Sequence, residues 1–232
     1  MESRFVDVEG TALHVGVTGD GPDILVLTGG PGCVQYLESD EIAVPGHRSW
    51  YPEPRGVGRS GGGRHDMERA IADLEAIRRA MGVVAWVVLG HSWGSDLAVR
   101  YAVEHPDVVK GVVGIAGRGA QRDRTWSEIY EAGQATEPVV EIDMSEEVWS
   151  SLSQSFTDWI HRPDLWRGLA DCVVPMHFIA AGDDIRPSWP LRQLATLVRH
   201  GRFSIVPDVP HDFWWTAPDI WIKTVKRACA GL

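Results

Sequence analysis

The chain has 232 residues, of which 44% are hydrophobic and 23% charged, and its formal net charge is −10 at pH 7. This length accommodates one large domain or at most two small ones, and the composition is typical of a globular protein rather than a disordered one. General binders of nucleic acid or of anionic membranes need a basic face, so this acidic chain is expected to bind neither.

The cysteines indicate a reduced environment. Cys33, Cys172 and Cys229 are odd in number and far apart, and no C-x-x-C or H-E-x-x-H motif occurs. Neither a disulfide framework nor a common zinc site is therefore expected. The first residues contain no basic segment followed by an apolar run, and no stretch approaches the roughly 18 apolar residues of a membrane span. These features predict a cytoplasmic protein.

In chain order, the first elements are two alternating segments, FVDVEG and TALHVGV, which predict an antiparallel hairpin turning at Gly10. Short, continuous apolar runs follow, and such runs are typical of strands buried on both faces of a mostly parallel sheet. The strands predicted in this way span residues 23–27, 49–51, 85–89, 109–116, 174–181 and 202–206.

Helices are predicted between these strands. An apolar stripe at helical spacing runs from Met67 to Met81, with Asp66 placed to cap its start and Gly82 to end it. Strands that alternate with helices indicate an α/β fold, in which helices cover both faces of a mostly parallel sheet. A second helix is predicted from an apolar stripe at residues 97, 98, 101 and 102 and stops at Pro106, and two more are predicted over residues 191–198 and 218–228.

One segment interrupts this alternation. Residues 118–172 contain no clear strand, and we interpret them as a mainly helical cap inserted into a core domain made of residues 1–117 and 173–232. Because loops and insertions over the strand ends build ligand pockets, this cap is expected to select the substrate. Four of the 11 tryptophans lie in it and are candidates for a pocket lining or for packing on the core: Trp126, Trp149, Trp159 and Trp166.

Two glycine-rich stretches carry catalytic patterns. Residues 55–63, RGVGRSGGG, contain both the G-x-G-x-x-G of dinucleotide-binding folds and a G-x-S-x-G around Ser60. A dinucleotide site needs a strand directly before the glycines and an acid at the end of the next strand. Here the preceding YPEPR holds two prolines, and the next strand ends in Gly90-His91. We therefore expect no nicotinamide or flavin cofactor.

The second G-x-S-x-G, at residues 90–94, lies in the context that a nucleophile needs. The buried strand AWVVL precedes Ser92 directly, and an apolar-striped helix follows it. A sharp turn between strand and helix strains the serine, and small residues two positions before and after it avoid clashes. Ser60 has no buried strand before it and sits in what we expect to be a flexible run. This contrast favours Ser92 as the nucleophile.

A serine hydroxyl needs a base, and the base needs an orienting carboxylate. The strand predicted over residues 174–181 is followed by Asp183 and Asp184, and the next strand leads to His211. Both loops lie at the carboxyl ends of parallel strands, beside the predicted serine turn. This order of serine, acid and histidine is the one expected in an α/β-hydrolase.

The oxyanion formed after attack requires preorganised N–H donors. One is predicted to be the backbone N–H of Trp93, directly after the nucleophile. The other is predicted to come from Gly30 in the loop TGGPG, where glycines let the backbone approach the reacting carbonyl closely.

With these motifs the chain resembles the α/β-hydrolase superfamily over nearly its whole length, and most closely the proline iminopeptidases and related small esterases. That family carries H-G-G-P-G, D-Q-R-G-x-G-x-S and G-x-S-W-G-S, where this chain has TGGPG, EPRGVGRS and GHSWGS. The resemblance implies that residues 55–63 shape the surroundings of the site. It also implies that Asp184, before I-R-P, is the acid rather than Asp183, and that His211 is the base.

The chain departs from the iminopeptidase pattern at three places. Thr28 replaces a histidine of the oxyanion loop, Glu53-Pro54 stands where Asp-Gln is usual, and the cap is shorter. Acids of the iminopeptidase cap bind the free amino group of the substrate. Seven acids in this cap are either a solvated helix face or an acidic rim for a cationic substrate: Glu128, Glu131, Glu137, Glu141, Asp143, Glu146 and Glu147.

The predicted activity is hydrolysis of a small ester, amide or short peptide through an acyl-enzyme on Ser92, with no metal or organic cofactor. Aminopeptidase and carboxylesterase activities both fit this prediction. One alternative is a binding protein that holds a small ligand with slow turnover or none. Another is a different reaction of the same triad, such as carbon–carbon bond hydrolysis or perhydrolysis.

Overall fold

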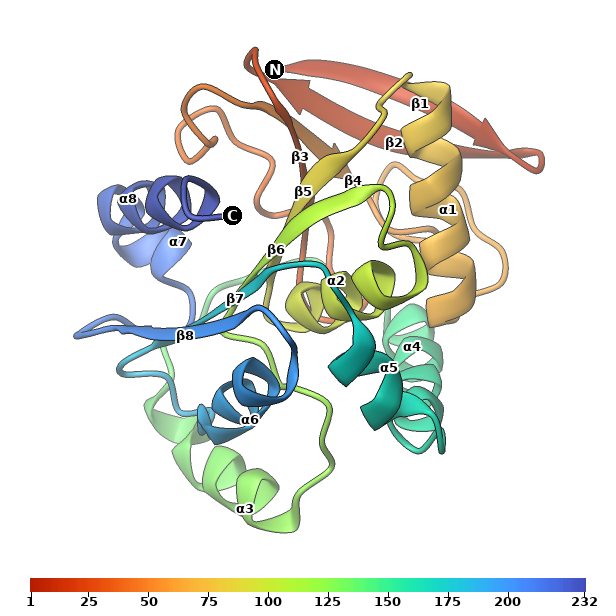
Figure 1. The fold of residues 1–232 in the computed structure, drawn as a ribbon. Coiled ribbons are helices and arrows are strands. Elements are labelled where there is room, and N and C mark those ends of the chain that lie inside the picture. The colour runs from red at the N-terminus through yellow and green to blue at the C-terminus, as the bar shows by residue number, and fades with distance from the viewer.

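A computed structural model describes all of residues 1–232, and its centre is one eight-stranded sheet in the order β1-β2-β4-β3-β5-β6-β7-β8 (Figure 1). β2 runs antiparallel to both of its neighbours, and the other pairs are parallel. The strands are β1 (Glu2–Val8), β2 (Thr11–Thr18), β3 (Asp23–Leu27), β4 (Arg48–Pro52), β5 (Trp86–His91), β6 (Val109–Ile115), β7 (Met176–Ala181) and β8 (Gly201–Val206).

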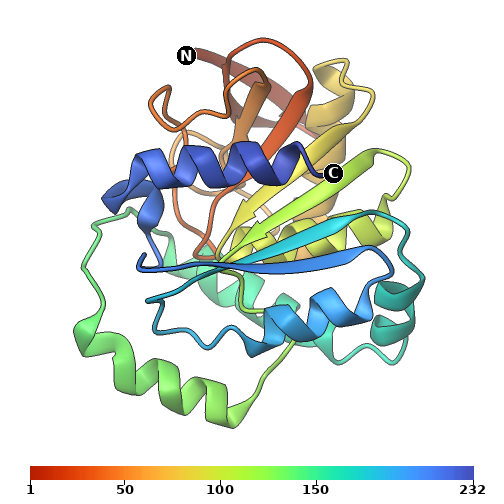
Figure 2. The same cartoon turned by 60° about the vertical axis from the view of Figure 1, so that its left-hand side comes forward.

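Helices cover both faces of this sheet (Figure 2). Along β3, Leu25 packs into the hydrophobic cluster shared with α1, α2 and α6, whereas Ile24 and Val26 pack into the cluster shared with α7 and α8. This two-sided burial explains why the strands are continuous apolar runs. The flanking helices are α1 (Met67–Ala80), α2 (Trp93–Glu104), α6 (Trp189–Leu197), α7 (Phe213–Thr216) and α8 (Pro218–Cys229).

The local signals for helix ends have their expected structures. The Asp66 carboxylate accepts the N–H of Arg69 at the start of α1, and Gly82 adopts a φ of +68° just after its end. Several predicted boundaries were wrong by one or two residues; the strand predicted from residue 174, for example, begins at Met176. Pro175 has no N–H to donate to a neighbouring strand, which favours a start after it.

Between β6 and β7 the chain forms α3 (Arg124–Gly133), a short 3-10 helix η1 (Gln134–Thr136), α4 (Glu146–Ile160) and α5 (Leu165–Asp171). α3 reaches outward below the sheet, whereas α4 and α5 lie beside α2 (Figures 1 and 2). Leu152, Phe156 and Leu169 belong to the main hydrophobic cluster. The division into core and cap domains stays a prediction. None of the helices combines the length and the apolar character needed to cross a membrane.

Candidate active site

Ser92 occupies a strained turn between β5 and α2. Its φ is 54° and its ψ is −128°, a left-handed conformation that costs energy for any residue with a side chain. Its backbone N–H donates to Ile115 O at 2.8 Å on the adjacent strand. A Cβ at Gly90 would lie 2.2 Å from Gly94 O, and one at Gly94 would lie 2.5 Å from Leu27 O. The two glycines of G-x-S-x-G are therefore required for the turn to close.

The loops after β7 and β8 bring an acid and a histidine together. His211 Nδ1 donates to Asp184 Oδ2 at 2.6 Å, and both side chains are buried. Asp184 Oδ1 accepts the Arg186 N–H at 2.9 Å. Burial alone would raise the pKa of Asp184, but the hydrogen bond from His211 and the charges of His211 and Arg186 outweigh it, so the pKa is lowered. Asp183 is exposed, and it makes no side-chain contact with His211.

The contact with Asp184 defines the form of the His211 ring. Because a carboxylate can only accept, Nδ1 carries a proton and Nε2 of the neutral ring has a free lone pair. His211 also lies against the Ser92 turn, since His91 Nε2 donates to His211 O at 3.1 Å and the two rings are 4.8 Å apart. The serine turn, the histidine and the acid thus meet at the carboxyl ends of the parallel strands.

Two backbone N–H groups beside Ser92 have no acceptor in the protein. The Gly29 N–H is already used, because it donates to Tyr36 Oη at 2.9 Å. Gly30, at a φ of +117°, has no acceptor for its N–H, and Trp93, as the first residue of α2, has none within its helix. A Cβ at Gly29 would lie 2.7 Å from Ser92 Cβ, so the glycine loop approaches the serine closely.

Sequence reasoning missed two residues that join these parts. His91 Nδ1 lies 2.7 Å from Tyr36 Oη. Because His91 Nε2 donates to the His211 carbonyl, Nδ1 accepts the Tyr36 hydroxyl proton and the ring is neutral. Burial, together with the nearby charge of His211, lowers the pKa of His91 to about 3. The position of His91 inside G-x-S-x-G was the available signal, but nothing in the sequence pointed to Tyr36.

His91, His211 and Asp212 form a group whose potential ligand atoms lie within 4.8 Å of one another. Both nitrogens of His91 are engaged in hydrogen bonds, one as donor and one as acceptor. His91 therefore offers no free lone pair to a metal, and the group does not fit a metal site.

The first glycine-rich stretch is a supporting loop. The Ser60 hydroxyl donates to Glu53 O at 2.8 Å and accepts the His14 N–H at 3.0 Å, and it is buried. Our expectation of a flexible run at Ser60 was wrong, because these hydrogen bonds tie the loop to β2 and to the residue directly after β4. Arg55 adds a two-pronged ion pair with Asp73 of α1, both contacts at 2.8 Å.

Two of the residues that depart from the iminopeptidase pattern, Thr28 and Glu53, make hydrogen bonds within the protein. Thr28 Oγ1 donates to Val34 O at 3.0 Å and so holds the glycine loop. Glu53 is buried and accepts from Arg59 Nε at 2.9 Å and from the Arg59 N–H at 2.7 Å. Both residues stabilise loops around the site.

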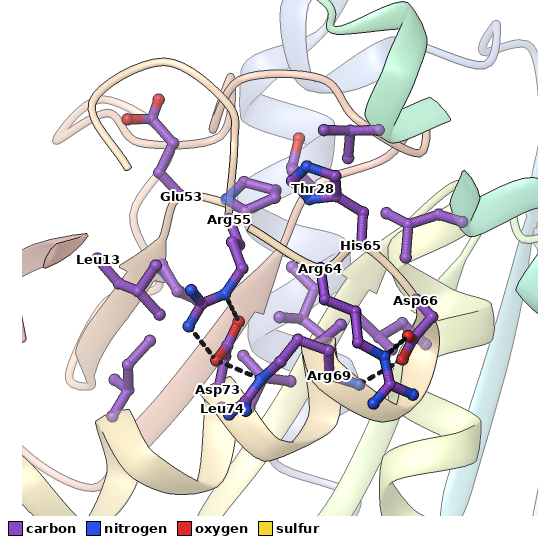
Figure 3. Close-up of a pocket in the computed structure, with 18 of the residues that line it drawn as sticks. Leu13, Thr28, Glu53, Arg55, Arg64, His65, Asp66, Arg69, Asp73 and Leu74 are labelled. Atoms are coloured by element: carbon purple, nitrogen blue, oxygen red, sulfur yellow. Dashed lines mark hydrogen bonds and ion pairs between the residues drawn. The ribbon is translucent and has the colours of Figure 1, made fainter. Parts of the chain in front are cut away.

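A small cavity of about 60 Å³ lies between α1, α4 and the loop that follows β4. Figure 3 shows the ion pairs in its wall, in which Arg55 and Arg69 contact Asp73 and Arg64 contacts Asp66. Ser92 does not line it. Trp93 does line it, but neither Asp184 nor His211 does, so this cavity adjoins the site without opening onto the nucleophile.

A second cavity, of about 450 Å³, opens beside Ser92, and Gly30 and Trp93 also line it. Trp126 and Trp149 of the cap contribute aromatic surface to its wall. Trp159, by contrast, packs against Phe156 in the core, and Trp166 is exposed. The pocket-lining interpretation therefore holds for two of the four cap tryptophans.

The acids of the cap lie mainly outside this cavity. Glu131 lines it, and Glu137 is paired with Arg186, while the other five are exposed and do not line it. Arg118, Arg122 and Arg186 line the cavity instead. The acidic rim proposed for a cationic substrate is therefore not present, and the solvated-face interpretation fits the structure.

Comparison with known proteins agrees with this architecture. Residues 22–139 match the family described as alpha/beta hydrolase fold, and the chain belongs to that family. The predicted fold class is confirmed. The chain is similar to the proline iminopeptidase of Neisseria gonorrhoeae, with 37% identity over 103 residues that cover 40% of this chain and 32% of that protein. It matches the Arabidopsis thaliana proline iminopeptidase at 32% identity over 121 residues, or 50% of this chain and 32% of that protein.

The chain thus aligns with about a third of the length of these curated relatives. Solved structures share the fold over nearly the whole chain. The proline iminopeptidase of Mycobacterium smegmatis superposes with a TM-score of 0.76 at 17% identity, covering 98% of this chain and 97% of that one. A thermophilic esterase from Thermogutta terrifontis gives a TM-score of 0.78 at 17% identity, covering 100% and 99%. The predicted resemblance to hydrolases related to proline iminopeptidase is confirmed.

Proposed function

We propose that the protein is a serine hydrolase that cleaves a small ester or amide through an acyl-enzyme on Ser92. The observation that carries this proposal is the 2.6 Å contact between His211 Nδ1 and Asp184, beside a serine held in a left-handed strand-to-helix turn. A serine, a histidine with a free Nε2 and a buried carboxylate are the groups that acyl transfer requires.

In the first step, the Ser92 hydroxyl oxygen attacks the substrate carbonyl and His211 Nε2 takes the hydroxyl proton. Asp184 fixes the ring through Nδ1, which leaves the lone pair of Nε2 available for the proton, and its negative charge stabilises the imidazolium. His211 then gives the proton to the leaving group, whose bond to the carbonyl carbon breaks. A water molecule loses a proton to His211, attacks the acyl-enzyme and releases the acid, with Ser92 regaining its proton.

The negative oxygen that forms during each attack is assigned to the N–H groups of Gly30 and Trp93. Tyr36 occupies the Gly29 N–H, which leaves the N–H groups of Gly30, in the loop against the serine, and of Trp93, directly after it, as the unpaired donors. Preorganised donors of this kind each contribute about 100- to 1,000-fold to the rate. The steps need no metal or organic cofactor.

Aminopeptidase activity is a second candidate because of the 37% identity to a proline iminopeptidase. The pocket supports ester hydrolysis better, because a positively charged amino group would meet Glu131 as the one cap acid in its wall. Arg118, Arg122 and Arg186 line the same wall and would repel that amino group. Proline methyl ester and its N-acetyl derivative separate the two. An aminopeptidase would strongly prefer the free amine, whereas similar rates on both substrates would identify an esterase.

The decisive experiment uses a fluorophosphonate probe followed by peptide mapping, because this probe reacts with activated serines. We expect labelling of the wild type at Ser92 and none of Ser92→Ala. Labelling should persist in Ser60→Ala, the matched serine of the other glycine motif. A folded wild-type protein that fails to react, or that reacts at Ser60, would overturn the proposal.

A further inference from the structure

The cavity beside Ser92 is lined by three arginines, and they differ in their partners. Arg186 is satisfied within the protein, since it is paired with Glu137 and contacts Asp184 Oδ1 at 3.1 Å. Arg118 and Arg122 form no ion pair with any carboxylate, whereas Arg124 next to them pairs with Glu128 at 2.7 Å. Two positive groups of this cavity are therefore uncompensated.

Arg118 is held in place without being satisfied. Its guanidinium carbon lies 5.1 Å from the centre of the Trp126 ring, and Trp126 is itself fixed by a 2.9 Å hydrogen bond from its Nε1 to Pro187 O. Arg118 Nε is buried and has no hydrogen-bond partner. A buried donor without an acceptor costs about 1–3 kcal/mol, and such groups in native proteins usually have a functional reason.

Arg122 adds a second positive charge next to the first. Burial lowers the pKa of Arg118, and the charge of Arg122 lowers it further, against the opposing effect of Asp96. Like charges gathered at one wall repel, so an anion placed between them would gain from both. Arg122 is exposed, which leaves its guanidinium free to approach a bound group.

The two carboxyl groups at this wall do not fill that role. Asp96 accepts the backbone N–H of Gly119 at 2.8 Å and of Arg118 at 3.2 Å, and it forms no ion pair with the Arg118 guanidinium. Burial raises the pKa of Asp96 to about 7, despite those N–H donors. Glu131 is exposed and forms no ion pair.

From this arrangement we infer that Arg118 and Arg122 bind a carboxylate of the substrate while Ser92 attacks an ester or amide carbonyl elsewhere in the same molecule. The inference rests on the proposed function for the attack, but not for the binding. Guanidinium groups recognise carboxylates through paired N–H donors, and Arg118 is already oriented for this by Trp126. The substrate class is an ester or amide that carries a free carboxylate, such as a monoester of a dicarboxylic acid.

Binding is tested separately from catalysis, with succinate as the probe and titration calorimetry as the readout. We expect succinate to bind the wild type and Ser92→Ala alike. Removal of one charged contact in Arg118→Gln or Arg122→Gln should weaken binding about 10- to 100-fold. The matched control Arg124→Gln loses the same charge outside the cavity and should bind as the wild type does. Because Arg122 is exposed, Arg122→Gln keeps the test available if Arg118→Gln fails to fold.

Catalysis is tested with monomethyl succinate against methyl butanoate, which has a methyl group in place of the carboxylate. We expect a higher kcat/KM for the charged ester, and a KM for it that rises at least about tenfold in Arg122→Gln but not in Arg124→Gln. Succinate binding without hydrolysis of either ester would refute the proposed function and keep the anion site. The anion site would be overturned if succinate failed to bind, or bound equally well without the arginines. It would also be overturned if the enzyme preferred the neutral ester, or preferred glycine methyl ester, which carries a positive charge in place of the carboxylate.

Discussion

Two turns of this molecule share the pattern G-x-S-x-G but have opposite roles in the structure. At residues 58–62 the serine hydroxyl is buried and makes two hydrogen bonds to the backbone, one with His14 in β2 and one with Glu53 directly after β4. At residues 90–94 the serine lies in a left-handed conformation, makes no capping bond to its helix and lines a large cavity. In the first turn the side chain stabilises the backbone, and in the second the backbone is strained to present the side chain.

This difference shows that the G-x-S-x-G pattern alone does not determine the structure of either turn. The strand that precedes Ser92 ends directly at the turn, and α2 begins at the next residue. The loop around Ser60 instead follows β4 after several residues and is held by the ion pair between Arg55 and Asp73. Predictions can therefore be made in matched pairs, one from each turn.

The largest expected effect is on turnover. Ser92→Ala should lower kcat about 10,000-fold or more, because removal of the nucleophile disables the whole triad. Its free energy of unfolding should not fall, since the strained side chain contributes no capping bond. Ser60→Ala should retain most activity but lose about 1–3 kcal/mol of stability, because the buried His14 N–H loses its acceptor. Ester hydrolysis and urea unfolding measure the two, and equal activities would contradict the assignment.

The next effect concerns the residue four positions after each serine, Asp96 in one turn and exposed Arg64 in the other. With its pKa raised from 3.8 to about 7, folded Asp96 holds a proton that the unfolded chain releases above pH 4. Stability from this group is thus complete below about pH 4 and is lost as the pH rises through about 7. The loss is on the order of 4 kcal/mol, at about 1.4 kcal/mol per pKa unit.

Urea titrations between pH 4 and 8 measure this dependence. The free energy of unfolding of the wild type should fall relative to that of Asp96→Asn across the range. Arg64→Gln is the matched control and should follow the wild type. Parallel pH profiles for the wild type and Asp96→Asn would show that Asp96 is ionised in the folded protein at pH 4.

The smallest expected effect separates the flanking glycines. Gly90→Ala places a Cβ 2.2 Å from Gly94 O, so the turn must shift, at a cost of about 1–3 kcal/mol. Gly62→Ala, in the other turn, meets nothing within 4 Å and has no positive φ. It should therefore unfold at the same urea concentration as the wild type. A tolerated Gly90→Ala would mean that the Ser92 turn does not need the close approach of its two ends.

The sequence was most informative where the signal is local. The strand, the G-x-S-x-G turn and the helix that place Ser92 are contiguous, so the residues themselves specify the turn. The two carboxyl-end loops could also be found, because parallel strands present their carboxyl ends at one edge of the sheet. The choice of Asp184 over Asp183 needed a resemblance, since both follow the same strand, and the structure brings Asp184 to 2.6 Å from His211.

Other features depend on segments far apart in the chain. Tyr36 and His91 meet across 55 residues, and no periodicity reports that contact. The acidic character of the cap suggested a cationic substrate, but charge counting along a helix does not say which side faces the cavity. In the structure Glu137 is paired with Arg186. The cavity wall contains Arg118 and Arg122, which no pattern in the sequence singled out.

By itself, the sequence determined the alternating strands and helices, the Ser92 turn, and the loops that carry Asp184 and His211, because each depends on hydrophobic period or on backbone sterics within a few residues. Only the tertiary structure decided which N–H groups remain free beside Ser92, which nitrogen of His91 and His211 carries the proton, and which charges line the cavity. These properties follow from desolvation and from contacts between distant segments, and they exist only once the chain is folded.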